Sequence, residues 1–451
     1  MASNGSPSSP RLPRRRVLQA GAASLAVGGF ATRSPALAAG FDWQRYKGER
    51  LEVYLSKSPR GDMLLAAQRE FEELTGMRVS AEQVPEQQFR QKFTLEFASG
   101  HPSFDVVNVA PHVQKAMLAK TNWLQDLRPM LADPSLTSPD FDIADFAGPV
   151  MHFATYPNGR MEMIIQNADY QVLFWNKEIF AAKGVAYPRT WAEQIDVAKA
   201  LHDPARGIYG YVGRGLKNAN TVVWAAMMLG WDLYGIDPDL TVHTTEPGAV
   251  AAAQIYQTLM RNYAPDGSIG FNWYESQNVF AQGHAAMWLD STGFAQPLED
   301  PTRSKVVGKV GYGIVPPGPK AQWSGLSADA MAIPAACPRK GAAWLYIQWA
   351  CGKEMMARQL ISGAGAPPRE SAYLRAKADP TKNALPLEWL EAVHASALIA
   401  RPHNPQIVAV TEYRDIFGIA LTNMILGADP ATELANATKE FQPILERTEH
   451  A

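Results

Sequence analysis

The sequence predicts an α/β protein in which helices cover a mostly parallel sheet and the chain forms two lobes. Three observations favour this class. Strand and helix patterns alternate over residues 51–120, and the strands are rich in valine. The same alternation returns over residues 208–290. About 410 residues follow the N-terminal segment, more than one hydrophobic core usually serves.

The elements before residue 168 follow from hydrophobic periodicity and from end signals. Strands are expected at residues 51–55, 79–84 and 104–109, and helices at residues 62–75, 87–98 and 112–120. Asp62 is the expected cap of the first helix, and Gly76 ends it. Residues 129–160 are rich in Pro, Asp and Gly, which favours loops.

Two loops of this first half are candidate ligand contacts. Ligands of parallel sheets bind at the carboxyl ends of the strands, where the strand order reverses. This rule selects the loop at residues 56–61, with Lys57 and Arg60, and the loop at residues 110–112, with His112.

The stretch at residues 168–194 marks a boundary between two modules. An apolar strand at residues 172–175 is followed by a helix at residues 177–183. The next helix opens at Thr190, whose hydroxyl is expected to accept from the Glu193 N–H in a reciprocal capping box.

Later elements repeat the same pattern. Strands are expected at residues 208–212, 286–290, 309–315 and 327–333, and helices at residues 219–229, 247–263, 342–349, 406–426 and 430–445.

Four motifs occur in a fixed order within residues 51–440. They are WNKEIFAAKGVAYPRTWAE (175–193), FAQGHAAM (280–287), GKVGYGIVPPGP (308–319), and the strand and helix at 327–349. Together they resemble the family 1 extracellular solute-binding proteins, the sugar receptors of ABC importers. GAPPR at residues 365–369 is loosely similar to a further turn of that family.

The resemblance implies the type II periplasmic-binding-protein fold, with two lobes, a hinge and a ligand cleft between them. Lobe one would comprise residues 41–167 plus 325–372, and lobe two residues 168–324 plus 373–447. The implied function is capture of a sugar or sugar alcohol by hinge closure and its delivery, unchanged, to ABC transporter permease subunits. No cofactor is implied, and we expect a monomer.

Acids, arginines and flat rings near strand ends are the expected ligand contacts, because sugar hydroxyls favour charged partners and sugar C–H faces favour aromatic rings. The candidates are Asp169, Tyr170, Asp290, Thr292, Phe294, Trp323 and Arg369, followed by Lys57, Arg60, His112, Arg214 and Asn218. The structural alternatives are a strand-edge acid for Asp169, a cap for Asp290 and a surface cation for Arg369. Residues 109–111 lack the aromatic residue of some oligosaccharide receptors, which favours a monosaccharide, disaccharide or sugar alcohol.

The first 38 residues have the pattern of an export signal. RRRVLQ at residues 14–19 matches the twin-arginine pattern, and ALA at residues 36–38 is a small-x-small cleavage site. The apolar run between them is about ten residues, and a bilayer span needs roughly 20. No cysteine follows the cleavage site, so we expect a periplasmic protein without a lipid anchor.

Charge and cysteine spacing exclude several classes. The net charge is -2, and loss of the five arginines in residues 1–38 takes it to -7, which argues against nucleic-acid and anionic-membrane partners. A helix predicted over residues 339–351 would place Cys351 about 20 Å from Cys337. A disulfide needs Cα atoms within about 7 Å, so free buried thiols are expected. Asp140, Asp142 and Asp145 lack the Gly and Glu of a calcium loop, and no metal site is expected.

The sequence contains no HExxH, CxxC, GxSxG or P-loop motif, which favours binding without catalysis. Alternatives remain at this point. The two carboxylates of a glycosidase meet only in the folded protein, and a lectin is a second alternative. A third is a receptor of the same fold for a polyamine, a phosphodiester or iron.

Overall fold

The computed structural model describes residues 40–449 apart from residue 157. The chain from Gly40 onward forms one compact unit. The predicted export signal at residues 1–38 lies outside the described residues. Within the described part of the chain, every helix is too short or too polar to cross a membrane.

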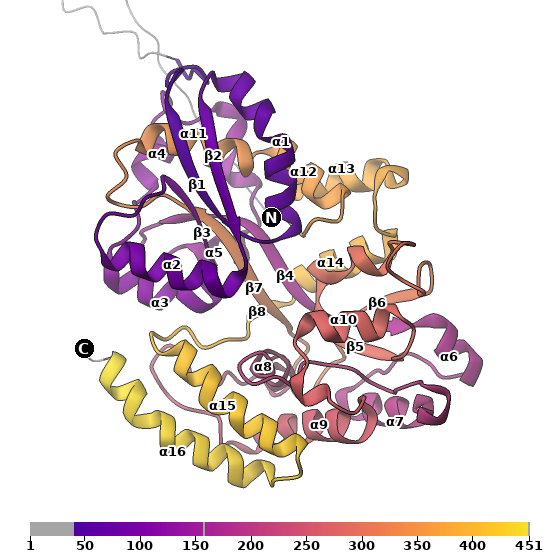
Figure 1. Ribbon diagram of the computed structural model, residues 1–451. Helices are drawn as coiled ribbons and strands as arrows, with labels where there is room; N and C mark the ends of the chain where they lie inside the picture. Colours follow the sequence, from indigo (N-terminus) through magenta and orange to yellow (C-terminus); the bar gives the residue numbers. More distant parts are fainter. Residues whose placement is uncertain (1–39, 157, 450–451) are drawn as a thin grey trace, which may run out of the picture. The chain divides into compact units, whose positions relative to one another are not determined.

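A mixed sheet of eight strands, in the order β2-β1-β3-β7-β4-β5, with β6 beside β4 and β8 beside β7, organises the fold (Figure 1). The strands are β1 (Arg50–Ser56), β2 (Arg78–Val84), β3 (Val106–Val109), β4 (Met163–Asn176), β5 (Met287–Ser291), β6 (Val310–Ile314), β7 (Ser324–Ala332) and β8 (Ala400–Pro402). β1, β2 and β3 are parallel to one another, as predicted. β4 is antiparallel to β5, β6 and β7.

β4 changes partners midway and thereby joins two parts of the sheet. Its residues from Met163 to Tyr170 pair with β7, and those from Gln171 to Asn176 pair with β5, β6 or both. The strand predicted at residues 172–175 is therefore only the end of a 14-residue strand. Polar residues at positions 166, 167 and 169 interrupt the apolar pattern on which the prediction relied.

Helices of the first half cover the β1 side of the sheet, and three helices follow the return strand β7. They are α1 (Pro59–Thr75), α2 (Glu86–Ala98), α3 (Pro111–Thr121), α11 (Lys340–Ala350), α12 (Lys353–Ile361) and α13 (Glu370–Ala378). α1 begins three residues before the predicted Asp62, because the Ser58 hydroxyl accepts from the Gly61 N–H at 3.1 Å and proline starts the helix. Its predicted end at Gly76, with φ 70°, is confirmed.

Residues 129–160 contain short helices as well as the predicted loops. These are α4 (Arg128–Ala132), the 3-10 turns Pro139–Phe141 and Ile143–Asp145, and α5 (Gly148–Ala154). Asp145 pairs with Arg369 and accepts from the Ser371 N–H, so this acidic segment is tied to the start of α13.

Most remaining helices pack beside the second part of the sheet. They are α6 (Lys177–Lys183), α7 (Trp191–Leu201), α8 (Thr221–Met228), α9 (Pro247–Tyr263), α10 (Trp273–Ala281), α14 (Leu387–Leu398), α15 (Val410–Ile425) and α16 (Pro430–Glu449). The Thr190 hydroxyl caps α7 by accepting from the Glu193 N–H at 3.1 Å, as predicted. The Glu193 carboxylate accepts from the Arg189 N–H rather than the Thr190 N–H, so the reciprocal half of the box was wrong.

The strand predicted at residues 208–212 was also wrong. Tyr209 and Val212 form only isolated bridges, to Ala285 and Trp288. Between them, Gly210 packs against the backbone of Ala198 too closely for any side chain. A Cβ at Gly210 would lie 2.0 Å from the Ala198 carbonyl oxygen.

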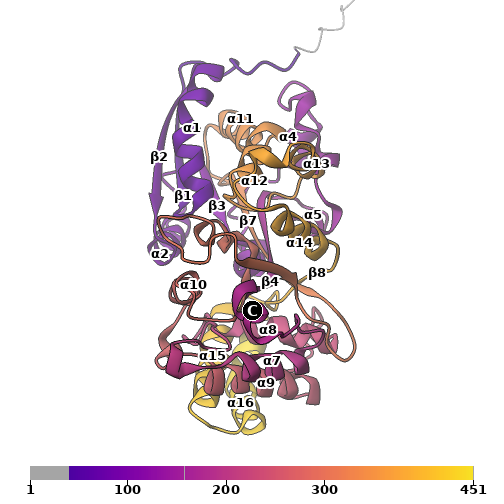
Figure 2. The same ribbon diagram turned by 90° about the vertical axis from the view of Figure 1, so that its right-hand side faces the viewer.

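Three clusters of buried side chains make up the core. One fills the space between β1, α1 and α11, and a second joins α7, α8 and α9 to α15 and α16. The third contains residues of both parts of the sheet, including Tyr54 and Trp288. Figure 2 shows α9, α15 and α16 together, and the Gln257 amide of α9 donates to the Met424 carbonyl at 2.7 Å. The predicted lobe boundaries stay a prediction.

Both cysteines are free and buried, as predicted. Burial raises the pKa of each thiol to about 12, and for Cys337 the nearby Asp105 carboxylate adds to this rise. At pH 8 neither side chain forms appreciable thiolate, the reactive form.

We predict that a thiol reagent such as Ellman's reagent leaves the native protein unmodified at pH 8 and modifies both thiols in guanidinium chloride. A native reaction on the minute timescale would contradict the burial of these residues.

Candidate ligand-binding site

One face of the paired strands β4 and β7 is polar. In β4 this face carries Asn167, Asp169 and Gln171, and in β7 it carries Ser327 and Asp329. The register pairs Asp169 with Ser327 and Asn167 with Asp329. Directly paired residues of an antiparallel ladder project to the same side of the sheet. We call these five residues the polar face.

Residues of the opposite face belong to the core. Tyr170 and Ala328 are buried there among the side chains of the third cluster. The Tyr170 N–H donates to the Thr292 hydroxyl at 3.1 Å, and Thr292 is fully buried. Both residues are thus buried and hold β4 against the turn that follows β5. As ligand contacts, Tyr170 and Thr292 stay predictions.

Asp169 is the acid of the polar face nearest that turn. Within the described structure its Oδ1 atom is buried and has no hydrogen-bond partner. A Cβ on Gly293 would lie 2.5 Å from this oxygen, so the backbone approaches the carboxylate where only glycine fits. Burial raises the pKa of Asp169, while the positive charge of Arg60 acts in the opposite direction.

Further acceptors lie next to Gln171. A Cβ on Gly325 would lie 3.0 Å from the Gln171 Cγ and 3.1 Å from the His403 Nδ1, so these two side chains meet over the glycine. Among residues 40–449 as described, Gln171 Oε1, His403 Nδ1 and Asn404 Oδ1 are buried without a hydrogen-bond partner. Leaving such groups unpartnered costs about 1–3 kcal/mol each. A ligand that donates hydroxyl groups would offset this cost.

Sequence analysis missed Gln171, His403 and Asn404. For Gln171 a signal existed, because polar residues alternate at positions 167, 169 and 171 after Gln166. No such signal existed for His403 and Asn404. They follow β8, a strand of three residues that pairs with the distant strand β7 and is too short to show a pattern.

The two first-half loops reach this face, as the parallel-sheet rule predicts. Arg60, in the first turn of α1, forms an ion pair with Asp329. His112, in the first turn of α3, has its Nδ1 2.8 Å from the Ala328 carbonyl oxygen. Lys57 is exposed and pairs with Asp62 at 2.5 Å, so it lies farther out than Arg60.

A second group stands at the carboxyl end of β5. Asp290 is fully buried and accepts from the Arg214 Nε at 2.9 Å and the Trp288 Nε1 at 3.2 Å. The Arg214 guanidinium lies 5.6 Å from the centre of the Phe294 ring, which stacks on Trp273 at 4.6 Å. Asp290 thus positions Arg214 and does not itself offer a free oxygen, whereas Arg214 and Phe294 are only partly buried.

Asn218 and Trp323 make contacts within the protein. Asn218 has a left-handed φ of 72° and donates to Asp415 at 3.0 Å, which stabilises the start of α8. The Trp323 Nε1 donates to Asp232 at 2.9 Å, and the Arg401 guanidinium covers its ring at 3.6 Å.

Arg369, one of the predicted ligand contacts, makes its contacts within the protein. It is fully buried and donates to the carbonyl oxygens of Cys351 (2.9 Å) and Phe141 (2.6 Å) and to the Asp145 carboxylate at 3.0 Å. Its guanidinium also stacks 3.9 Å from the Phe146 ring. The side chain therefore fastens the acidic segment to the main body.

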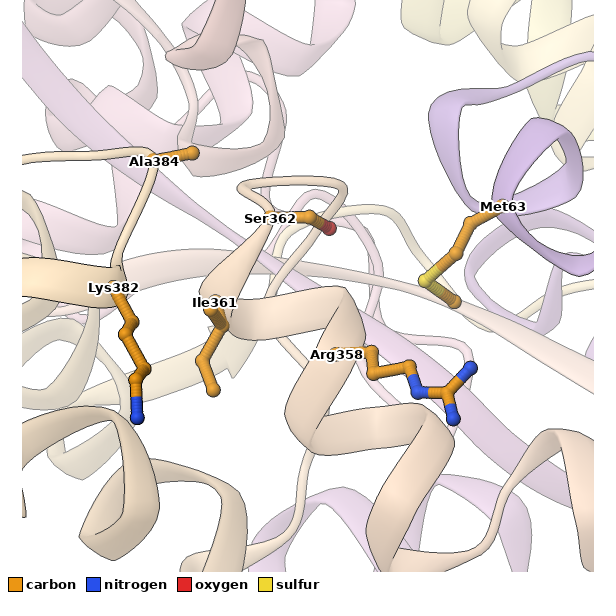
Figure 3. Close-up of a pocket in the computed structure, with 6 residues that line it drawn as sticks. All are labelled: Met63, Arg358, Ile361, Ser362, Lys382 and Ala384. Atoms are coloured by element: carbon orange, nitrogen blue, oxygen red, sulfur yellow. The ribbon is translucent and has the colours of Figure 1, made fainter. Parts of the chain in front are cut away.

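Two cavities lie outside the polar face. One of about 410 Å³ is bordered by Met63 of α1, by Arg358, Ile361 and Ser362, and by Lys382 and Ala384 (Figure 3). The other, of about 360 Å³, is at the far end of β4, beside the C-terminal ends of α6, α7 and α10. Lysine and arginine side chains around the second cavity complement those negative helix ends. Neither cavity is bordered by a predicted ligand contact.

The arrangement of two helix-covered sheet regions joined by antiparallel crossing strands defines a type II periplasmic-binding protein. Comparison with known proteins agrees. Residues 57–357 match the family described as bacterial extracellular solute-binding protein, and the chain belongs to that family. Its members are binding proteins rather than enzymes.

Individual relatives are distant in sequence. The erythritol/L-threitol-binding protein of Mycolicibacterium smegmatis is 26% identical over 425 residues, which cover 89% of this chain and 87% of that protein. A probable amino-acid ABC transporter periplasmic-binding protein of Sinorhizobium fredii is 26% identical over 80% of this chain and 82% of its own length. The crystal structure of an ABC transporter solute-binding protein from Agrobacterium radiobacter K84 with ribitol superposes with a TM-score of 0.79, at 26% identity, over 88% of this chain and 99% of that one.

We predict that Arg369→Met destabilises the protein by about 3–5 kcal/mol, because it leaves the Asp145 carboxylate and two buried carbonyls without their cation. Urea unfolding measures the change. Arg375→Met, at an exposed arginine of the same helix, is the control and should cost less than about 1 kcal/mol. Equal, small effects of both substitutions would contradict the anchoring role.

His403 is expected to make stability depend on pH. Burial and the nearby positive groups His112, Arg414 and Arg214 lower its pKa well below the ordinary value. Below about pH 6.5 the unfolded chain takes up a proton there and the native state does not, so stability falls as pH drops. His403→Gln should remove up to about 1.4 kcal/mol per pH unit from that slope. Unfolding at pH 7 and pH 5 tests this, with exposed His101→Gln as a control that leaves the slope unchanged.

Proposed function

We propose that this protein captures a small neutral polyhydroxylated solute, with a sugar alcohol as the leading class, and delivers it to the permease of an ABC importer. The observation that carries the proposal is the set of buried, unpartnered acceptor atoms beside the strands that join the two parts of the sheet. A polyol is rich in hydroxyl donors and carries no charge to neutralise. The ligands of the mycobacterial and agrobacterial relatives, erythritol, threitol and ribitol, support the same class.

The proposed contacts combine the polar face with its neighbours. Hydrogen bonds from the ligand's hydroxyl groups would be accepted by Asp169, Gln171, His403 and Asn404. Two further side chains, Arg60 and His112, would approach from the first-half loops. Arg214 and the exposed part of Phe294 would approach from the carboxyl end of β5. The charged groups among these make the stronger hydrogen bonds.

The mechanism is a change in conformational equilibrium without a chemical step. Ligand contacts from both parts of the sheet stabilise a closed form over an open form, in proportion to the difference in affinity. The strands that bend are β4 and β7, which carry the polar face. The closed form then binds the permease.

Export by the twin-arginine route to the periplasm, release after residue 38 and the absence of a lipid anchor belong to the same proposal. The RRRVLQ motif and the ALA site support the route. The family supports a place outside the cytoplasm.

An amino-acid ligand is the second candidate, because the Sinorhizobium relative is a probable amino-acid receptor. An amino acid needs a cation for its carboxylate and an anion for its ammonium group. Arg60 and Asp329 are of those types, but they already pair with each other, and Arg214 pairs with Asp290. Because Arg60 and Arg214 are already paired, and the unpartnered atoms of Asp169, Gln171 and His403 are acceptors, the arrangement favours a polyol.

Ligand screening tests the proposal. Erythritol, threitol, ribitol, mannitol, glucose, maltose and a set of amino acids are compared by thermal shift and then by titration calorimetry. We predict a dissociation constant near micromolar, about 8 kcal/mol, for at least one polyol and no binding of amino acids. Binding of an amino acid alone, or cleavage of a glycoside, would overturn the proposal.

Asp169→Asn replaces one acceptor oxygen by a donor at constant shape. Affinity for the best polyol is expected to fall at least tenfold, about 1.4 kcal/mol, with the fold intact. The matched control is Asp266→Asn, at an exposed acid, which should leave the affinity unchanged. Equal affinities of the two variants would remove Asp169 from the site.

A further inference from the structure

The residue that covers Trp323 is the starting point. The Arg401 guanidinium carbon lies 3.6 Å from the centre of the indole ring, in direct contact with one of its faces. An indole face is the surface on which a sugar ring stacks. Arg401 therefore occupies a position that a longer carbohydrate would use.

A single carboxylate fixes both partners. Asp232 Oδ1 accepts from the Trp323 Nε1 at 2.9 Å and from the Arg401 Nη1 at 2.8 Å. Asp232 itself has a left-handed φ of 57° and closes the turn Leu229–Trp231, where its N–H donates to the Leu229 carbonyl. The ring and the guanidinium are thus held together by a residue of a separate segment.

The strand register places Arg401 at one end of the polar face. β7 and β8 are parallel, and Gly325 pairs with Arg401. His403 follows β8 directly, and its Nδ1 atom lies with the Gln171 side chain beside Gly325. The unpartnered acceptors of Gln171 and His403 therefore lie beside Gly325, the residue that pairs with Arg401.

A second arginine–aspartate pair stands at the other end of the polar face. Arg60 and Asp329 form an ion pair in the row of Asn167. Asp329 comes four residues after Gly325 in β7, which is about 13 Å along the strand. An arginine–aspartate pair therefore stands at each end of the row of acceptors.

We propose that Arg401 is a specificity-determining residue: with Asp232 it covers Trp323 and limits the ligand to a single short polyol or monosaccharide. The inference rests on the proposed function, and it names the size class of the solute. It also reassigns Trp323, which becomes a covered ring in place of an open stacking platform.

Removal of Arg401 tests this assignment. Ribitol and maltitol are the two probes, because maltitol adds a sugar ring to a short polyol chain. In Arg401→Ala the affinity for maltitol should rise at least tenfold over the native protein, while the affinity for ribitol should change less than threefold. In Arg401→Ala combined with Trp323→Leu the maltitol gain should disappear, because the uncovered ring is gone.

Three further variants keep the test decisive. Asp232→Ala releases Arg401 without deleting it and should give a smaller gain for maltitol. Arg401→Gln serves if the alanine variant does not fold, and Arg401→Lys keeps the charge but loses the planar contact with the ring. Circular dichroism confirms folding before each titration.

The possible failures are distinguishable. If the native protein binds ribitol and the folded Arg401 variants gain nothing for maltitol, the inference is overturned and the proposed function stands. If the Arg401 variants lose ribitol, Arg401 is a direct contact and the inference is again overturned. If the native protein binds no polyol, the proposed function fails and the inference fails with it.

Discussion

The pairing of β4 with β7 is the constraint on which the rest of the structure depends. β4 is continuous over 14 residues and changes partners at Gln171, so one strand belongs to both parts of the sheet. The polar face lies at the same place. In the mechanism proposed above, β4 and β7 bend near that residue. A ligand bound there would contact both parts, and its binding energy would act directly on the equilibrium between the open and closed forms.

Burying a polar side chain costs free energy unless it regains hydrogen bonds, and several buried groups of this protein do regain them. Asp290 is surrounded by three donors, and Arg369 by carbonyl oxygens and a carboxylate. Buried polar atoms without a partner occur at several places in the described residues, and those of Asp169, Gln171 and His403 lie on or beside the polar face. Their position on the strands that join the two parts of the sheet is what supports the proposed site.

Of the proposed site, the sequence could predict the residues whose place follows from the order of the parallel strands. Arg60 and His112 follow parallel strands, and the carboxyl ends of such strands meet at one edge, so their approach to a common face followed from order alone. Burial was not predictable in this way. Tyr170, Thr292 and Arg369 are chemically suitable for a sugar, but the chain uses them internally, and Arg369 meets Asp145 across 224 positions.

The sequence by itself determined the fold class, the bounds of α9, the cap at Thr190 and the free thiols, because periodicity, capping and spacing act over a few residues. The tertiary structure alone decided which polar atoms are left for a ligand. That outcome depends on partners brought together from distant segments, such as Gln171 with His403 and Trp323 with Arg401 and Asp232. Hydrogen bonds are satisfied in space, and no local pattern records which of them are missing.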